Sequence, residues 1–336
     1  MDDRRIVELM GVESSERDVG WLQQALQSAV ELEFATLPVY LSGMWSIQDQ
    51  SGEVYDLVNS VVLEEMLHMG LACNMMRAIG STPQIVAPAY PCGLPGGVRP
   101  GLEVYLAGLS PVTVQMYMQI EMPEHPVAAE AEAYPTIGAF YDAILAAFEA
   151  LSPPLSPTGQ LAASFSVEVP DPPGPDKTIQ EPLKPVQSLA DVQQAITTIK
   201  DQGEGTSLSP DAPEFGGELA HYYRFGEIYH GRKLVPTDGE WQWTGDPVEF
   251  PPCYPVAKVP AGGYPNLPAS QAFDAAFGQL VAHLESAWGA GGQSELDQAI
   301  GVMFSLYNLA QPLITMPLPQ GGGNYGPDFV PASQAR

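Results

Sequence analysis

The segment from Val61 to Ala72 has the apolar period of a buried helix, yet it carries a glutamate and a histidine on its apolar face. Apolar residues recur at three- and four-residue spacing around Glu65 and His68, so both side chains should point toward the core from a helix at residues 53–79. A buried carboxylate without a partner is costly. Glu-x-x-His on a buried helix face is how carboxylate-rich four-helix proteins hold metal ions. A single pair is more often solvated, so a metal site needs partners on other helices.

A second helix, expected at residues 18–47, carries another inward carboxylate. Its apolar positions recur at helical spacing, and Glu33 lies on the same stripe, whereas Glu31 falls on the polar side and is the reserve candidate. Tyr40, seven residues after Glu33, lies on that face as well. We expect Tyr40 to be either a hydrogen-bond partner of the metal ligands or a core residue, and we treat it as a candidate catalytic residue.

The third helix of the bundle is expected at residues 111–122 together with 137–151. Glu121 shares a side of the first part with apolar residues, but it stands one turn from the proline that ends the helix. Glu124 is equally placed to reach inward. The third inward carboxylate is therefore Glu121 or Glu124, and we favour Glu121.

The fourth helix, expected at residues 214–232, holds two further copies of the motif, Glu218 with His221 and Glu227 with His230. The copies are nine residues apart, which at about 100° per residue places them on opposite faces. We favour Glu218 and His221, because the other pair reaches the end of the helix. Arg224, one turn later, is either a substrate-side group for a carboxylate or half of a structural salt bridge.

Together the four helices predict a four-helix bundle with a di-metal carboxylate centre. One glutamate from each of two helices and a Glu-x-x-His from each of the other two is the ligand census of such centres. Carboxylate oxygens and imidazoles suit two iron ions, with manganese as the alternative. The predicted ligands are Glu33, Glu65, His68, Glu121, Glu218 and His221.

The charge and composition of the chain limit which binding partners and which cellular compartment we expect. The formal charge of −27, from 13 basic and 40 acidic residues, argues against nucleic acid and anionic membranes as partners. The three cysteines are far apart, and no apolar stretch is long enough to cross a bilayer, so we expect a cytoplasmic protein. We expect one mainly helical domain over residues 1–336, with long Pro/Gly-rich insertions and extra helices at 270–288 and 294–316. The apolar faces of these extra helices either close the core or form a homodimer.

Six sequence segments form a series: Glu-Leu-Glu-Phe-Ala-Thr-Leu-Pro at 31–38, Glu-Glu-Met-Leu-His at 64–68, Leu-Pro-Gly-Gly-Val-Arg-Pro at 94–100, Ile-Glu-Met-Pro-Glu at 120–124, His-Tyr-Tyr-Arg-Phe at 221–225 and Gly-Asn-Tyr-Gly-Pro-Asp-Phe at 323–329. From about Asp18 to Phe329 the chain resembles the iminophenyl-pyruvate dimer synthase family. That family includes the enzymes that form tryptophan-derived dimers in violacein and rebeccamycin biosynthesis. The resemblance implies a ferritin-like fold and, in characterised members, oxidative coupling of two α-imino acids.

The predicted function is therefore a di-iron oxidoreductase of specialised metabolism. It would act with dioxygen or peroxide on a small substrate derived from an amino or imino acid. His125 is a further candidate for the substrate side of the site. The alternatives are a non-catalytic metal-binding or scaffold protein, and a binding module in which the carboxylates no longer hold metal.

Overall fold

The computed structural model describes residues 5–123, 136–169, 177–203, 210–212 and 218–331. In this part of the chain the helices are α1 (Arg5–Met10), α2 (Val19–Trp45), α3 (Glu53–Ala78), α4 (Pro111–Ile120), α5 (Ile137–Leu151), α6 (Leu189–Gly203), α7 (His221–His230), α8 (Pro268–Ser286) and α9 (Gln293–Ile314). Single turns of helix lie at Ser14–Glu16, Pro95–Gly97 and Ala287–Gly291. The strands pair as antiparallel hairpins, β1 (Ala163–Val169) with β2 (Lys177–Leu183), β3 (Asp211–Ala212) with β4 (Glu218–Leu219), and β5 (Val235–Thr237) with β6 (Glu240–Gln242).

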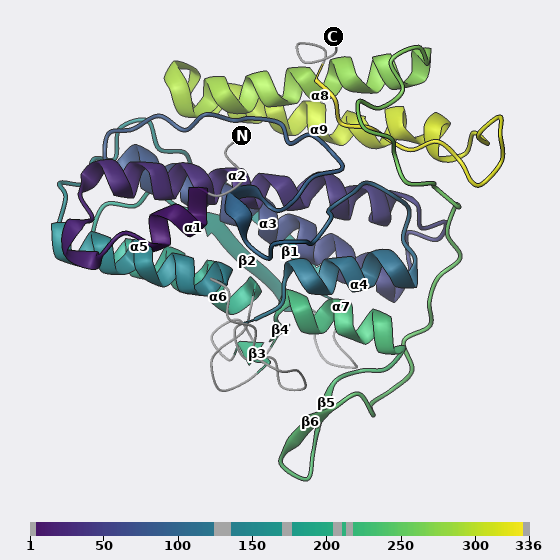
Figure 1. Cartoon of the computed structure of the whole chain (residues 1–336), viewed down its shortest axis with the longest axis horizontal. Coiled ribbons are helices and arrows are strands. Elements are labelled where there is room, and N and C mark those ends of the chain that lie inside the picture. Colours follow the sequence, from purple (N-terminus) through teal and green to yellow (C-terminus); the bar gives the residue numbers. More distant parts are fainter. Residues whose placement is uncertain (1–4, 124–135, 170–176, 204–209, 213–217, 332–336) are drawn as a thin grey trace.

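The long helices α2 and α3 pack side by side along the middle of the molecule (Figure 1). Asp18 caps the first of them, because its carboxylate accepts a hydrogen bond of 2.8 Å from the backbone N–H of Trp21. From Leu32 to Trp45 every residue of α2 is buried, and the helix continues through Pro38. Burial on all sides follows from the position of α2 between two layers of helices.

The other half of the bundle consists of four shorter helices, α4, α5, α6 and α7. Helix α4 packs against α7, and α5 packs against α6, so each pair covers one part of the long helices (Figure 1). Ser110 and Thr113 form a capping box that starts α4, and Glu121 is the residue that caps its C-terminal end. The ends of α4 and α6 and the starts of α5 and α7 consequently lie near the middle of α2 and α3.

Most helix bounds agree with the sequence analysis to within two or three residues, but two elements differ. The fourth helix was expected from residue 214, whereas α7 begins at His221 and Glu218 lies in β4. Gly216-Gly217 disfavours a helix at this point, which the helical spacing of Glu218 and His221 concealed. The second is the β1–β2 hairpin, because the Pro-rich stretch from residue 152 to 185 predicts at most one strand, near residues 165–169.

Helices α8 and α9 form a second layer over the outer face of α2 and α3 (Figure 1). Phe273 and Phe277 of α8 are buried against Phe329 of the C-terminal segment, with ring centroids 4.9 and 5.1 Å apart. The ring of Phe329 stacks on Trp45 of α2 at 5.9 Å. The apolar faces of these two helices thus close the core within one chain, while Phe304 on the far side of α9 is 72% exposed.

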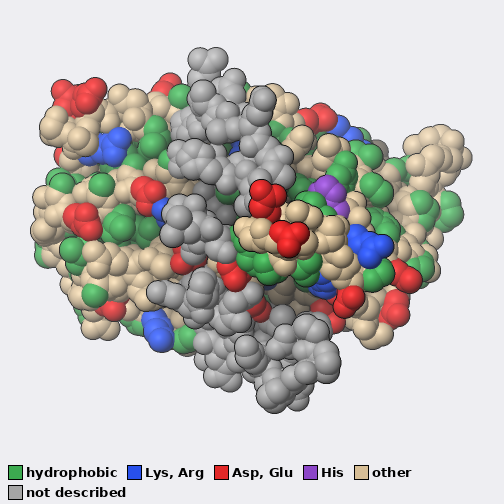
Figure 2. All heavy atoms as spheres, turned by 90° about the horizontal axis from the view of Figure 1, so that it is seen from below, with side chains coloured by type: hydrophobic (Ala, Val, Ile, Leu, Met, Phe, Trp, Pro, Cys, Tyr) green, Lys and Arg blue, Asp and Glu red, His purple; other side chains and the backbone are tan. Residues whose placement is uncertain are grey.

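On the underside of the molecule, acidic side chains are scattered among apolar ones and the basic side chains lie in separate small groups (Figure 2). This distribution agrees with the excess of acidic over basic residues in the sequence. Among the helices of the described residues, none combines the length and the hydrophobicity that a bilayer span requires.

Candidate metal centre

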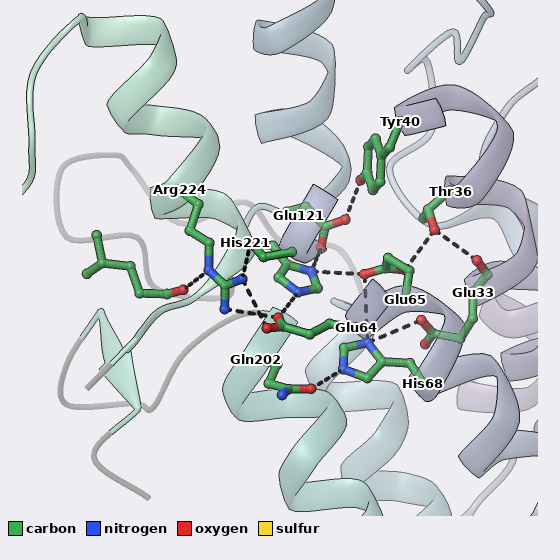
Figure 3. A network of polar contacts seen from close by, with 12 residues as sticks. Glu33, Thr36, Tyr40, Glu64, Glu65, His68, Glu121, Gln202, His221 and Arg224 are labelled. Carbon is green, nitrogen blue, oxygen red and sulfur yellow. Dashed lines mark hydrogen bonds and ion pairs between the residues drawn. The ribbon is translucent and has the colours of Figure 1, made fainter. Parts of the chain in front are cut away.

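Glu33, Glu65 and His68 form the first of two groups of possible metal ligands, all of them buried. Glu33 comes from the middle of α2, and the other two come from one face of α3 (Figure 3). The Nδ1 atom of His68 lies 3.7 Å from a carboxylate oxygen of Glu33 and 3.7 Å from one of Glu65. These separations are too long for hydrogen bonds but suit atoms that share a cation.

Glu65, Glu121 and His221 form the second group, which is equally buried. The Nδ1 atom of His221 lies 2.9 Å from Oε1 of Glu65 and 3.6 Å from Oε2 of Glu121. This nitrogen forms no hydrogen bond within the described residues, although it is fully buried. Because Glu65 belongs to both groups, its carboxylate is placed to bridge two ions.

Each histidine is oriented through its other ring nitrogen. The Nε2 atom of His68 lies 2.7 Å from the side-chain oxygen of Gln202 on α6, and Nε2 of His221 lies 2.8 Å from Oε2 of Glu64 on α3. When these Nε2 atoms donate to their acceptors, both Nδ1 atoms present a lone pair to the carboxylates. A metal-binding histidine is usually held this way. The two rings lie nearly parallel, with centroids 5.5 Å apart.

Glu64 in turn forms a buried ion pair with Arg224 of α7. The two guanidinium NH groups lie 3.0 and 2.9 Å from the two carboxylate oxygens, which is a bidentate contact. Arg224 also donates to the hydroxyl of Ser60 at 3.0 Å and lies 3.5 Å from Glu218. In the structure Arg224 therefore forms a salt bridge, and its guanidinium group contacts Glu64.

Hydroxyl groups hold the three carboxylates in place. Tyr40 donates to Glu121, Tyr141 of α5 donates to Glu33 at 2.5 Å, and Thr36 donates to Glu65 at 2.7 Å. Tyr40 therefore lies beside the candidate ligands as a hydrogen-bond partner. Each carboxylate keeps a second oxygen that faces the middle of the cluster (Figure 3).

The cluster carries more negative charge than its buried position tolerates without compensation. Burial and the charge of Glu65 raise the pKa of Glu33 well above its usual value, and the same two causes raise the pKa of Glu121. Burial also opposes ionisation of Glu65, but contacts with His221 and His68 outweigh it and lower the pKa. Despite burial, the surrounding carboxylates raise the pKa of His221 well above its usual value. Without a cation, protons must supply the missing positive charge.

Two divalent ions fit these residues. Three carboxylates and two neutral imidazoles would balance most of the charge of such a pair, and hard oxygen with imidazole nitrogen is the donor set that iron and manganese take. A cavity of about 20 Å³ reaches the cluster and is lined by Glu33, Glu65, His68 and Glu121 with residues that include Ile137 and Gly138 of α5. It has room for about one water molecule or a diatomic gas.

The remaining sequence candidates lie elsewhere. Glu218 belongs to neither ligand group, because the chain at this residue is β4 and its side chain faces Arg224. Glu31 pairs with Arg5 at 3.2 Å on the outer side of α2. Glu227 accepts hydrogen bonds from Lys233 and from the backbone of Leu234, and His230 stacks on Trp243. Glu124 and His125 lie outside the described residues.

Four residues of the site were not among the sequence candidates: Thr36, Glu64, Tyr141 and Gln202. Glu64 gave no signal of its own, because its partner Arg224 lies 160 residues further along the chain. Tyr141 and Gln202 lie on helices whose sequences show only packing patterns, so nothing in the sequence separated them from core residues.

Comparisons with known proteins concern the fold that carries this site. A family model described as Ferritin-like matches residues 26–230, the part of the chain that supplies all the candidate ligands. A ferritin-like protein from Caulobacter vibrioides, known from a crystal structure at 1.95 Å resolution, has a similar fold with a TM-score of 0.59. The two chains are 24% identical, and the similarity covers 87% of this chain and 96% of the other. No curated protein matches the chain significantly in sequence.

The expected fold class is confirmed by these matches together with the observed helices. A family match over residues 26–230 covers more than half of the 336 residues and includes most of α2 and all of α3, α4 and α7. The chain therefore belongs to the ferritin-like family.

Proposed function

We propose that the protein is a di-iron oxidoreductase that uses dioxygen or peroxide to oxidise a small substrate derived from an amino or imino acid. The observation that carries the proposal is the position of Glu65, whose carboxylate belongs to both buried ligand groups. Glu33 and His68 would complete one metal position, and Glu121 and His221 would complete the other. Manganese is the alternative ion for the same donors.

Bound iron would supply the redox chemistry, and the protein would supply geometry and exclusion of water. Thr36, Tyr40 and Tyr141 hold the carboxylates through hydrogen bonds, while Gln202 and Glu64 orient the two imidazoles. The small cavity beside Glu33 and His68 would admit dioxygen. Arg224 acts through Glu64, so we assign it to positioning His221 and not to substrate binding.

The substrate class rests on the sequence resemblance to imine dimer synthases. Joining two α-imino acids through one new carbon–carbon bond removes two hydrogen atoms, that is two protons and two electrons. Reduction of dioxygen to hydrogen peroxide, or of hydrogen peroxide to water, takes up both. Dioxygen or peroxide is therefore the oxidant that the coupling requires.

A non-catalytic metal-binding protein is the second candidate function, because the same ligands would bind iron for storage or scaffolding. The shielded position of the cluster and the small size of its cavity favour a reaction with a gas over exchange of ions.

Oxygen consumption by the iron-loaded protein tests the proposal. The chain is loaded with ferrous iron without oxygen, its iron content is measured, and dioxygen uptake is followed with and without amino-acid-derived imines. Glu65→Ala is compared with Glu31→Ala, a matched change at an acidic residue outside the site. We expect about two irons per chain and imine-dependent uptake in the parent and in Glu31→Ala, and neither in Glu65→Ala. Iron that is retained by the parent without oxygen uptake would establish the non-catalytic alternative. Equal iron content in all three proteins would show that the cluster around Glu65 is not where iron binds.

A further inference from the structure

A second cavity, separate from the metal centre, lies between the α8–α9 layer and the outer face of α2 and α3. Its volume is about 90 Å³. Phe34 and Met69 line it from the long helices, Phe277 and Met303 line it from the outer layer, and Phe329 closes one side. Phe34 directly follows Glu33 in α2, so the two side chains leave the helix about 100° apart and serve different sites.

The lining of this cavity is chemically uniform. Every lining residue is apolar or a glycine. Trp288 is the only one with a polar side-chain atom, and its indole N–H already donates to Asn74 at 3.0 Å. A buried water needs two to four polar partners, and a charged or hydrogen-bonding ligand would leave its own groups unpaired. The chemistry of the lining therefore excludes amino and imino acids and favours a hydrocarbon.

The residues that line the cavity extend along the axis of α9. Its lining residues on α9 run from Leu296 to Leu306, which at 1.5 Å per residue is a span of about 15 Å. Spread over that length, about 90 Å³ leaves room for a single thread of atoms and little width for a ring. Met66, Met69 and Met303 lie along it, and methionine side chains adapt to the contour of a flexible ligand.

We propose that this cavity binds one unbranched alkyl chain. Native interiors contain few voids larger than a water molecule, and an empty cavity lowers stability in proportion to its volume. An alkyl chain restores the missing contacts of Phe34, Phe277 and Phe329 without adding a polar group that the lining would have to satisfy. The site is independent of the proposed metal chemistry, because it shares no residue with the two ligand groups.

Contact quenching of Trp288 by a brominated alkane tests the proposal. The full chain is titrated with 1-bromodecane and, as a compact aromatic ring, with bromobenzene. Trp288→Phe identifies the part of the fluorescence that comes from this residue. Ala299→Phe places a ring in the cavity, and Met303→Phe is a second filling variant in case the first does not fold. Phe304→Ala, on the exposed side of the same helix, controls for adsorption to the surface.

We expect saturable quenching of Trp288 by 1-bromodecane at one chain per protein, at least tenfold weaker binding in either filling variant, and no change in Phe304→Ala. Tighter binding of bromobenzene, quenching that does not saturate, or unchanged binding in both filling variants would overturn the proposal. Vesicles of phosphatidylcholine with brominated acyl chains distinguish the source of the ligand. Quenching by 1-bromodecane alone indicates a free chain, and quenching by both indicates a chain drawn from a lipid.

Discussion

The Nε2 atom of His221 lies 2.8 Å from the carboxylate of Glu64, and this contact turns Nδ1 of the same ring toward Glu65 and Glu121. Glu64 and Glu65 are neighbours in α3, yet they contact opposite sides of one imidazole. The adjacent Arg224 neutralises Glu64, so the pair orients His221 without adding net charge to the cluster. The two successive glutamates thus have different roles: Glu65 is a candidate metal ligand, whereas Glu64 orients the candidate ligand His221.

Replacing Glu64 should weaken metal binding and destabilise the fold. In Glu64→Ala, His221 loses its acceptor and Arg224 remains buried without its main partner. We expect a 10- to 100-fold loss of metal affinity and a loss of about 3–5 kcal/mol in the free energy of unfolding. Denaturant unfolding and metal titration measure the two effects. The double variant Glu64→Leu with Arg224→Met should be more stable than either single variant, and a double variant less stable than both would contradict a buried charge as the cause.

The number of ions should depend on which carboxylate is removed. Glu65 belongs to both ligand groups, whereas Glu33 belongs to the first alone and Glu121 to the second alone. We expect Glu65→Ala to lose both ions and Glu33→Ala or Glu121→Ala to keep about one, as measured by elemental analysis after gel filtration. Helical circular dichroism checks the fold of each variant. Retention of two ions by Glu65→Ala would show that Glu65 is not a ligand shared by the two metal positions.

Gln202 should matter for only one of the two metal positions. Its oxygen accepts from Nε2 of His68, so Gln202→Leu releases that ring, whereas Gln202→Glu keeps an acceptor and serves as the control. We expect the leucine variant to bind the first-group ion about 10- to 100-fold more weakly, with the second position unchanged. Calorimetric titration with manganese resolves the two steps. Equal weakening of both steps would show that Gln202 acts on the whole fold.

An acid pair far from the metal centre should control how stability varies with pH. Burial, together with the hydrogen bond and negative charge of Asp328, raises the pKa of Asp274 on α8 to about 8. The unfolded chain releases that proton near pH 4. The folded protein therefore binds the extra proton from about pH 4 to about pH 8, and the free energy of unfolding falls as the pH rises through this window. At lower pH the contribution is fully present.

Asp274→Asn should remove this dependence. The amide oxygen can still accept from the backbone N–H of Val330, and the amide nitrogen can donate to Asp328. We expect the variant to melt higher than the parent at pH 9 and at about the same temperature at pH 5. Asp297→Asn, at an exposed position of α9, is the matched control. A variant that melts below the parent at pH 9 would refute the raised pKa of Asp274 as the cause.

Helical spacing was enough to predict the bundle and the approach of Glu33, Glu65, His68, Glu121 and His221, because each lies on a helix face or at a helix end set by its neighbours. It was not enough for Glu218. That prediction extended one helix through Gly216-Gly217, and the chain instead forms β4 before α7 begins. Tyr141 and Gln202 come from helices with ordinary packing patterns, so only the three-dimensional arrangement shows that they touch Glu33 and His68.

The two ligand groups differ in how firmly the backbone holds them. Glu33, Glu65 and His68 all come from the interior of α2 and α3, where every backbone hydrogen bond of a long helix resists displacement. Glu121 is the residue that caps the end of α4, and His221 is the first residue of α7, so both stand where helices fray. The two positions should therefore load in sequence. The half formed by Glu33, Glu65 and His68 would hold the first ion, and the helix ends that carry Glu121 and His221 would settle around the second.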